Sequence, residues 1–255
     1  MTDLVEINMI SYYQRFYKPG IIVLSLALCC FNLNTVQAQP INNLKSKFIF
    51  FPYPMEDNWR SSIGVILTTM PEDITEEFHF RIPAIDLHVN RKLTRNIYLN
   101  GRVNTQFLQN LITVGPKWAT TLSDRLSVSA GNDIGWWFGF VNVEGFKTRG
   151  SGWQNYPNVT AGFRFQRNLF LSLKTEAIMN LGIQTSTGGV MVKSDDRLFS
   201  GGSVTIALEQ PFYGKKSLTL GFRAIYTNFY WQTWALFETF DRNIFYPQII
   251  IGLIL

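Results

Sequence analysis

Two histidines are the only imidazole groups in this chain, and one of them has an acidic neighbour at strand spacing. Asp86 and His88 are separated by one residue, so both side chains would point to the same face of a β-strand. An acid–histidine pair can serve proton transfer or activate a nucleophile. The pair lies beside a predicted short turn, and His79 has no acid–nucleophile set in its own strand, so we expect a structural ion pair and no enzyme. A hydrolase or acyltransferase that uses His88 or His79 remains the alternative.

No other pattern of residues predicts a bound metal or cofactor. Both cysteines, Cys29 and Cys30, lie in the amino-terminal segment. Two histidines without a cysteine form no recognisable set of metal ligands, so we expect neither a metal ion nor a cofactor.

The charged residues of the central chain alternate with apolar residues. In Leu169–Ile183 the odd positions are mostly large and apolar, whereas Lys174 and Glu176 occupy even positions together with Ser172, Asn180 and Gly182. If the apolar face of each strand contacts lipid, the charged face must point into the interior of a barrel. This reasoning predicts a set of charged residues in the lumen: Asp86, His88, Arg102, Lys117, Asp133, Arg164, Lys174, Glu176, Glu209 and Arg223.

The near balance of these charges predicts the state of the lumen. Unpaired buried charges cost several kcal/mol, so we expect Arg102, Arg164, Lys174 and Arg223 to pair with Asp133, Glu176 and Glu209. The interior of a barrel of about ten strands is scarcely wider than its side chains can fill. We therefore expect a plugged or very narrow lumen.

The elements that would position these residues are long alternating strands. Strands in soluble sandwiches can alternate too, but they are usually about 5–6 residues long. Leu169–Ile183 is far longer and fits a tilted membrane-spanning strand, which needs roughly 9–11 residues in the hydrocarbon. The sequence predicts an all-β fold, a transmembrane antiparallel up-and-down β-barrel of about ten strands. We place the strands near Ser61–Met70, Phe78–Asn90, Ile97–Phe107, Leu111–Thr121, Arg125–Val141, Tyr156–Gln166, Leu169–Ile183, Leu198–Glu209, Ser217–Tyr230 and Phe245–Leu255.

The amino terminus has the features of a cleavable signal peptide. Arg15 and Lys18 precede the apolar stretch Ile21–Phe31, which is shorter than the roughly 20 residues of a spanning helix. Small residues end at Ala38, where we place the cleavage site. The alternatives are an uncleaved anchor helix and a lipoprotein signal ending at Cys29. Leu28 disfavours the lipoprotein signal, because it is too large for the position before the modified cysteine.

The predicted organisation is therefore a signal peptide (1–38), a periplasmic amino-terminal extension (39–58) and a transmembrane barrel (59–255). Cleavage would remove both cysteines, so no disulfide stabilises the mature chain. The net charge of +5 is spread without a basic cluster, so we do not expect nucleic acid as a partner.

The predicted connections alternate in length. Most connections after odd-numbered strands are long: Pro71–Glu77, Asn142–Asn155, Gln184–Arg197 and Trp231–Ile244. Those after even-numbered strands, such as Arg91–Asn96, are shorter, and Leu108–Asn110 is an exception to the pattern. Outer-membrane barrels have short periplasmic turns and longer external loops, so we expect the long connections outside the cell.

Aromatic residues are concentrated at the ends of strands that face these long connections. Amphipathic rings favour the headgroup level of a bilayer, whereas ordinary core packing in a soluble β-protein is the alternative. We predict an outer aromatic girdle of Trp136, Phe138, Phe140, Trp153, Tyr156, Tyr230, Trp231 and Trp234.

Over roughly residues 59–255, these patterns make the chain resemble the outer-membrane β-barrel proteins of Gram-negative bacteria. The resemblance implies location in the outer membrane, contact with the lipid bilayer, and biogenesis by the barrel-assembly machinery. The final strand of that class usually ends in an aromatic residue, whereas this chain ends in Leu255. We expect a non-enzymatic envelope, scaffold or binding role. A narrow pore for small solutes, or a lipid- or peptide-modifying enzyme, are the alternatives, and the oligomeric state stays open.

Overall fold

The computed structural model describes residues 48–75, 81–143, 146–166, 169–192, 197–212, 216–234 and 242–255. The predicted signal peptide, residues 1–38, lies outside this part of the chain. Within the described ranges, no helix has the length and apolar character needed to cross a membrane.

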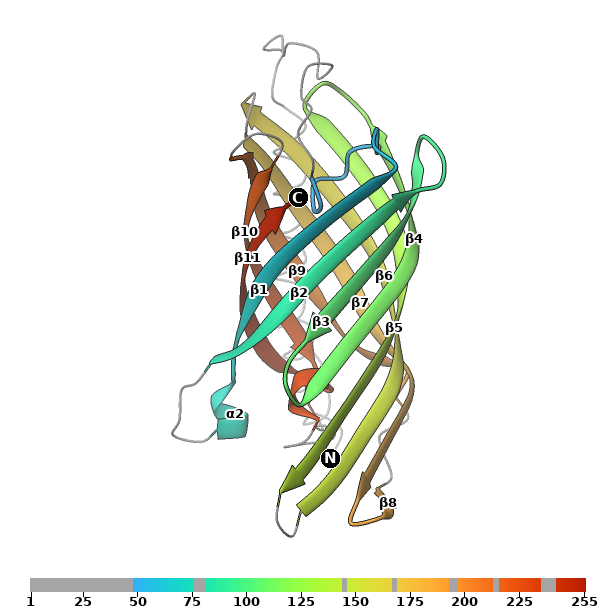
Figure 1. The fold of residues 1–255 in the computed structure, drawn as a ribbon, viewed down its shortest axis with the longest axis vertical. Coiled ribbons are helices and arrows are strands. Elements are labelled where there is room, and N and C mark those ends of the chain that lie inside the picture. Colours follow the sequence, from blue (N-terminus) through green and yellow to red (C-terminus); the bar gives the residue numbers. More distant parts are fainter. Residues whose placement is uncertain are drawn as a thin grey trace, which may run out of the picture. The chain divides into compact units, whose positions relative to one another are not determined.

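Antiparallel strands form one closed ring, shown in Figure 1. Strands adjacent in the chain pair with each other, and β1 pairs with β11 to complete the ten-strand barrel. The short β8 is added to β7 outside the ring. The strands are β1 (Trp59–Thr69), β2 (Arg81–Lys92), β3 (Ile97–Thr105), β4 (Gln109–Thr121), β5 (Leu126–Val143), β6 (Phe146–Gln166), β7 (Leu169–Thr187), β8 (Val190–Val192), β9 (Phe199–Pro211), β10 (Ser217–Thr227) and β11 (Ile244–Ile254). The short helices α2 (Glu72–Thr75) and η3 (Trp231–Thr233) lie in two of the connections.

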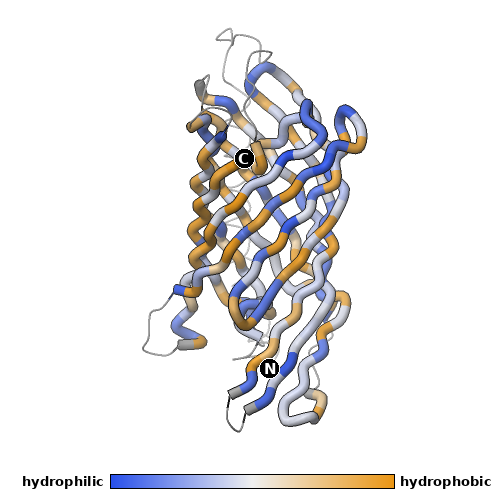
Figure 2. Tube along the Cα trace, viewed as in Figure 1, coloured by the Kyte–Doolittle hydropathy of each residue, from blue (hydrophilic) through white to orange (hydrophobic). Residues whose placement is uncertain are grey.

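The exterior of the barrel is apolar. Successive side chains on a strand point to opposite faces of the wall, and the large apolar side chains occupy the outward positions. Large apolar side chains such as Val65, Leu173 and Phe222 are 42–45% exposed on the outside. Polar side chains at the alternate positions, such as Asn100 and Thr219, are buried inside. Figure 2 shows hydrophobic and hydrophilic residues alternating along the strands of the wall.

This exterior belongs in a membrane. A continuous apolar surface of this kind would be an association hazard in water, whereas lipid requires it. Ring closure leaves no unpaired edge within the hydrocarbon. The predicted all-β transmembrane barrel is confirmed. Closed antiparallel barrels of this kind cross the outer membranes of Gram-negative bacteria, which also agrees with the predicted location.

The predicted strands match the observed ones closely except for the sixth. We expected it to begin at Tyr156, whereas β6 begins at Phe146. The predicted long loop Asn142–Asn155 is therefore wrong, since β5 and β6 stay paired as far as Val143 and Phe146. The pairing of β4 with β5 reaches only Gly139, so a sheet of β5–β8 continues past the barrel wall, at the lower end in Figure 1.

Two segments outside the strands fold into the lumen. Phe48–Pro52, here called the N-terminal plug, is largely buried, although we expected this part of the chain as a periplasmic extension. Asn228–Trp234, here called the loop plug, follows β10, contains η3 and is also buried. They occupy the end of the barrel with the short turns and the end with the long connections, respectively.

Candidate functional site in the barrel interior

The N-terminal plug is held by one carboxylate. Glu209 on β9 is fully buried, and its Oε1 accepts hydrogen bonds from the backbone N–H groups of Ile49 (2.8 Å) and Phe50 (3.1 Å). Its Oε2 accepts a third bond from the N–H of Phe51, at 2.6 Å. Bonds to a charged acceptor are stronger than neutral ones, so this side chain can fix an irregular backbone segment in the lumen.

Aromatic packing completes this anchor. The rings of Phe48 and Phe51 lie with their centroids 4.2 Å and 5.0 Å from that of Phe170 on β7. The guanidinium of Arg60 donates to the carbonyl oxygen of Phe48 at 2.6 Å. The segment therefore has polar and apolar attachments to several strands of the wall.

A chain of hydrogen bonds attaches the loop plug to the wall. Gln232 accepts through Oε1 from the Thr68 hydroxyl (2.6 Å) and from the Tyr230 hydroxyl (2.7 Å). The Gln248 amide donates to the Tyr230 oxygen at 2.5 Å, and the Gln109 amide donates to the Gln232 carbonyl oxygen at 2.6 Å. Burial raises the pKa of Tyr230 to about 12, which keeps its hydroxyl protonated as a donor.

Two tryptophans pack the loop plug against β5 and β6. The indoles of Trp137 and Trp234 are fully buried, with ring centroids 6.2 Å apart. A Cβ added at Gly139 would lie 2.4 Å from Trp234 Nε1, and one at Gly150 would lie 2.5 Å from Trp234 Cε3. The absence of side chains at these two positions therefore makes the slot that receives Trp234.

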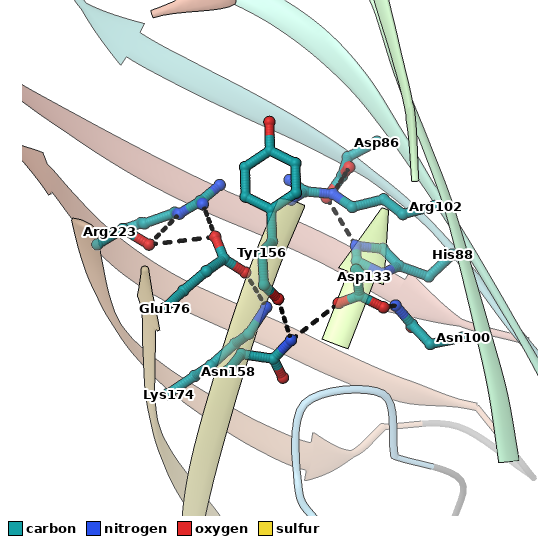
Figure 3. Close-up of polar contacts among 11 residues, drawn as sticks. Asp86, His88, Asn100, Arg102, Asp133, Tyr156, Asn158, Lys174, Glu176 and Arg223 are labelled. Atoms are coloured by element: carbon teal, nitrogen blue, oxygen red, sulfur yellow. Dashed lines mark hydrogen bonds and ion pairs between the residues drawn. The ribbon is translucent and has the colours of Figure 1, made fainter. Parts of the chain in front are cut away.

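Charged side chains meet between the two plugs (Figure 3). Asp86 accepts from Arg102 Nε at 2.6 Å and lies 2.8 Å from His88 Nε2. Asn104 also donates to Asp86, at 3.2 Å. These contacts join residues of β2 and β3 in one buried cluster.

A second cluster surrounds Glu176 on β7. Lys174 donates to its Oε2 at 2.5 Å, and Arg223 and Ser203 bond to its Oε1. The two cations come from β7 and β10, so the carboxylate links strands that are not adjacent in the barrel.

Asp133 forms a third cluster with amides rather than cations. Its two carboxylate oxygens accept from Asn100 and Asn158, each at 3.0 Å. Figure 3 shows Asp133 on β5 between Asn158, from the neighbouring β6, and Asn100, from β3 on the far side of β4. The amides satisfy the carboxylate without a direct ion pair.

An internal cavity of about 50 Å³ remains between the plugs. Phe50 of the N-terminal plug and Trp231 of the loop plug both line it, together with charged groups of all three clusters. A water molecule needs roughly 10–15 Å³ on this measure, so the cavity has room for a few waters only.

The structure brings most of the predicted charged residues to the lumen but changes some partners. The cation partners that we expected for Asp133 and Glu209 are replaced by side-chain amides and backbone N–H groups. Arg164 lies over the Phe170 ring at 5.7 Å. Lys117 lines the cavity, and its stem fills the space beside Gly131.

The predicted aromatic girdle divides into two groups. Trp136, Phe138, Phe140 and Trp153 lie on the outer face, with exposures of 38% for Trp136, 55% for Phe140 and 53% for Trp153. The predicted outer position is wrong for Tyr156, Tyr230, Trp231 and Trp234, which are buried in the interior. Tyr156 shares its face with Asn158, so strand parity could have placed it inside. Tyr230, Trp231 and Trp234 reach the lumen because the chain turns inward after β10. The alternation of residues along a strand does not predict this turn.

The candidate catalytic pair is enclosed. His88 is 8% exposed, and the ring of Phe50 packs edge-on against it, with centroids 5.5 Å apart. Access to the pair from that side requires movement of the N-terminal plug. His79 lies outside the described residues. Within the described ranges, no group of three or more His, Cys, Asp or Glu side chains could hold a metal ion.

Comparison with known proteins finds likeness in solved structures only. No protein-family model and no curated protein matches the chain. The KdgM porin shares 8% identity, with a TM-score of 0.38 over 76% of this chain and 97% of that one. Neisserial surface protein A shares 9%, with a TM-score of 0.38 over 78% and 97%. The outer membrane protease OmpT from Escherichia coli shares 10%, with a TM-score of 0.45 over 82% and 99%.

Proposed function

We propose that the protein is a non-enzymatic outer-membrane barrel whose own segments close its lumen, and that it serves the envelope as a scaffold or binding protein. One observation carries this proposal: plugs enter from both ends and leave a cavity of about 50 Å³ between them. A general diffusion pore needs a continuous aqueous path, which is wider in barrels of 16–18 strands. The bilayer, and during biogenesis the barrel-assembly machinery, are the partners proposed for such a barrel.

The interior charges support a structural role. Glu176 has two cationic partners, Lys174 and Arg223, and Asp86 has Arg102 beside His88. Mutually bonded charges are poor ligands for a passing ion, because each would have to exchange a short bond for a transient one. The pair between Glu176 and Arg223 also ties β7 to β10, on either side of β9.

Conductance in a planar lipid bilayer tests this proposal. The purified full chain should give little or no steady current at moderate voltage. Glu209→Ala removes the acceptor of three backbone N–H groups, and Gln232→Ala removes the centre of the loop-plug network. The double variant should show frequent or lasting openings. Glu56→Gln, an exposed acidic position outside the lumen, is the matched control. A stable open channel in the unmodified protein would contradict the scaffold proposal.

A narrow pore for small solutes is the second candidate. One observation favours it: charged groups line the cavity between the N-terminal plug and the loop plug, and neither plug is part of the barrel wall. Displacement of both plugs would turn this cavity into a charged passage. The pore candidate predicts openings in the unmodified protein, whereas the scaffold proposal predicts openings only in variants that loosen a plug.

An enzymatic role has weaker support. The Asp86–His88 pair has the residue types of an acid–base catalyst, but Phe50 covers the histidine. His88→Ala should leave lipid hydrolysis, acyl transfer and peptide cleavage by the purified protein unchanged. A measurable activity that this variant loses would overturn the non-enzymatic proposal.

A further inference from the structure

The part of the β5–β6 hairpin near the barrel rim carries an exposed aromatic cluster on its outer face. The ring of Trp136 stacks on Phe138 with centroids 4.5 Å apart, and it lies 6.2 Å from the ring of Trp153. Trp136 and Trp153 are direct cross-strand partners. Exposed tryptophans at the end of a lipid-facing band favour the headgroup level, so this cluster marks the membrane interface.

Two cations follow the cluster on the same face. Phe138 pairs with Ser151, Phe140 with Arg149, and Asn142 with Lys147, so Arg149 and Lys147 occupy successive rows beyond the rings. Both side chains are exposed. Within the described ranges, no carboxylate forms an ion pair with either of them. The polar end of the hairpin is thus positively charged on the side that faces lipid.

The spacing of these rows places the two cations at the outer edge of the bilayer interface. A strand advances about 3.4 Å per residue, and at a tilt of about 45° this is about 2.4 Å of height. Arg149 is four residues from Trp153, so its Cα lies about 10 Å further from the centre of the membrane than the Cα of Trp153. The headgroup zone is roughly 5–8 Å thick on each side of the hydrocarbon. With the Trp153 ring at the hydrocarbon boundary, the Arg149 Cα lies just beyond this zone, and its long side chain can reach back to the lipid phosphates.

We propose that the outer face of the β5–β6 hairpin is a binding site for the phosphorylated headgroup of a membrane lipid. Arg149 and Lys147 bind the phosphate, and Trp136 and Trp153 contact the first part of the acyl chains. Arginine suits this role because its guanidinium can donate two parallel hydrogen bonds to a phosphate. The occupant is a lipid of the leaflet at the hairpin end, because the cations and the rings lie on the one face that the barrel turns towards lipid. A lipid held there would also cover the outer surface of the hairpin beyond β4.

Native mass spectrometry of the full chain in detergent tests this site, with diphosphorylated lipid A as the probe. Lys147→Gln combined with Arg149→Gln should weaken binding about 30-fold, because each cation near an anionic headgroup contributes about fivefold in affinity. Dephosphorylated lipid A should bind the unmodified protein with a similar loss. Arg95→Gln with Lys216→Gln, two exposed cations at the other end of the barrel, is the matched control and should retain binding.

Three outcomes would overturn the proposal. Equal binding of the phosphorylated and dephosphorylated lipids would show that the phosphate is not recognised. Unchanged binding by the hairpin variant, with the control variant weakened, would place the lipid at the other rim. Full competition by free inorganic phosphate at matched concentration would identify a simple anion site without a lipid. Thermal unfolding of each variant, followed by circular dichroism, verifies that the barrel itself is retained.

Discussion

Single residues determine how the interior of this barrel is filled. The loop plug fits against the wall because Gly139 and Gly150 leave space for the indole of Trp234. Both glycines lie at inward-facing positions of paired strands, and Gly139 is the direct partner of Gly150. Any side chain in this row would occupy the volume that Trp234 fills. These glycines are needed for close packing, not for an unusual backbone conformation.

Gly139→Ala should therefore displace Trp234 and loosen the loop plug. The added Cβ would lie 2.4 Å from Trp234 Nε1, and overpacking of this kind costs about 1–3 kcal/mol. Chemical unfolding in lipid vesicles measures the loss of stability, and bilayer recordings should show brief openings. Gly182→Ala is the control, because its Cβ would have no atom within 4 Å. Equal effects of the two variants would contradict the packing role of Gly139.

Glu176 should be the most sensitive charged position of the lumen. Glu176→Gln leaves Lys174 and Arg223 without their shared carboxylate, and removal of one partner of a buried pair costs about 3–5 kcal/mol. Chemical unfolding of the variant in vesicles should show a loss of this size. Glu56→Gln, at an exposed position, should change stability by less than about 0.5 kcal/mol. A loss below about 1 kcal/mol for Glu176→Gln would mean that water already solvates the cluster.

Parity along a strand predicts the inward or outward direction of a residue but not its hydrogen-bond partner. Alternation with the mostly apolar odd positions of Leu169–Ile183 predicts Lys174 and Glu176 inside the barrel, and both lie there. The pairing of Glu176 with Arg223 depends on the register of β7, β9 and β10, which alternation along one strand does not specify. The amide partners of Asp133 and the backbone partners of Glu209 cannot be predicted from periodicity or charge balance, since an asparagine side chain and a peptide N–H carry no charge.

At the scale of elements, the β5–β6 hairpin shows why sequence reasoning shortened one strand. Residues 147–152 read Lys-Thr-Arg-Gly-Ser-Gly, a composition typical of a loop. In the structure these residues pair with β5 without interruption, because the glycines face the tryptophans of the interior and the cations face outward. Only knowledge of the packed tryptophans explains glycine at those positions. The other strand ends were predictable to within a few residues because alternation stops where the chain leaves the wall.

Depth along β7 should determine the cost of a charge on the outer face. Leu173 is 42% exposed in the part of β7 that is paired on both sides, whereas Leu181 is 54% exposed near the rim. Leu173→Arg should cost about 2–4 kcal/mol and Leu181→Arg about 0–1 kcal/mol, as measured by unfolding in vesicles. A larger cost at Leu181 would mean that the membrane boundary lies beyond that residue. Costs close to zero at both positions would contradict the assigned lipid-facing surface.

At the scale of the whole molecule, the fold could be predicted and the closure of its lumen only in part. Alternation, strand length and strand number specify an apolar cylinder with a polar interior. Charge balance led us to expect a plugged lumen formed by paired side chains. The structure closes the lumen mainly with two segments of backbone, Phe48–Pro52 and Asn228–Trp234. Their inward direction depends on Glu209 and on the glycine slot, which are far away in the sequence.

The orientation of the barrel remains the largest testable consequence of this architecture. The short turns, among them 93–96, lie at the end of the barrel where β1 begins and β11 ends. The connections that contain α2, β8 and the loop plug lie at the other end. Outer-membrane barrels keep short turns and both termini in the periplasm, so the β7–β8 turn should lie outside the cell. An epitope inserted between Gly188 and Gly189, which have positive φ angles of 60° and 84° in an exposed turn, should bind antibody on intact cells. The same epitope inserted at Arg95 should react only after the outer membrane is permeabilised. The reverse pattern would invert the barrel and move the hairpin face with Arg149 and Lys147 to the periplasmic leaflet.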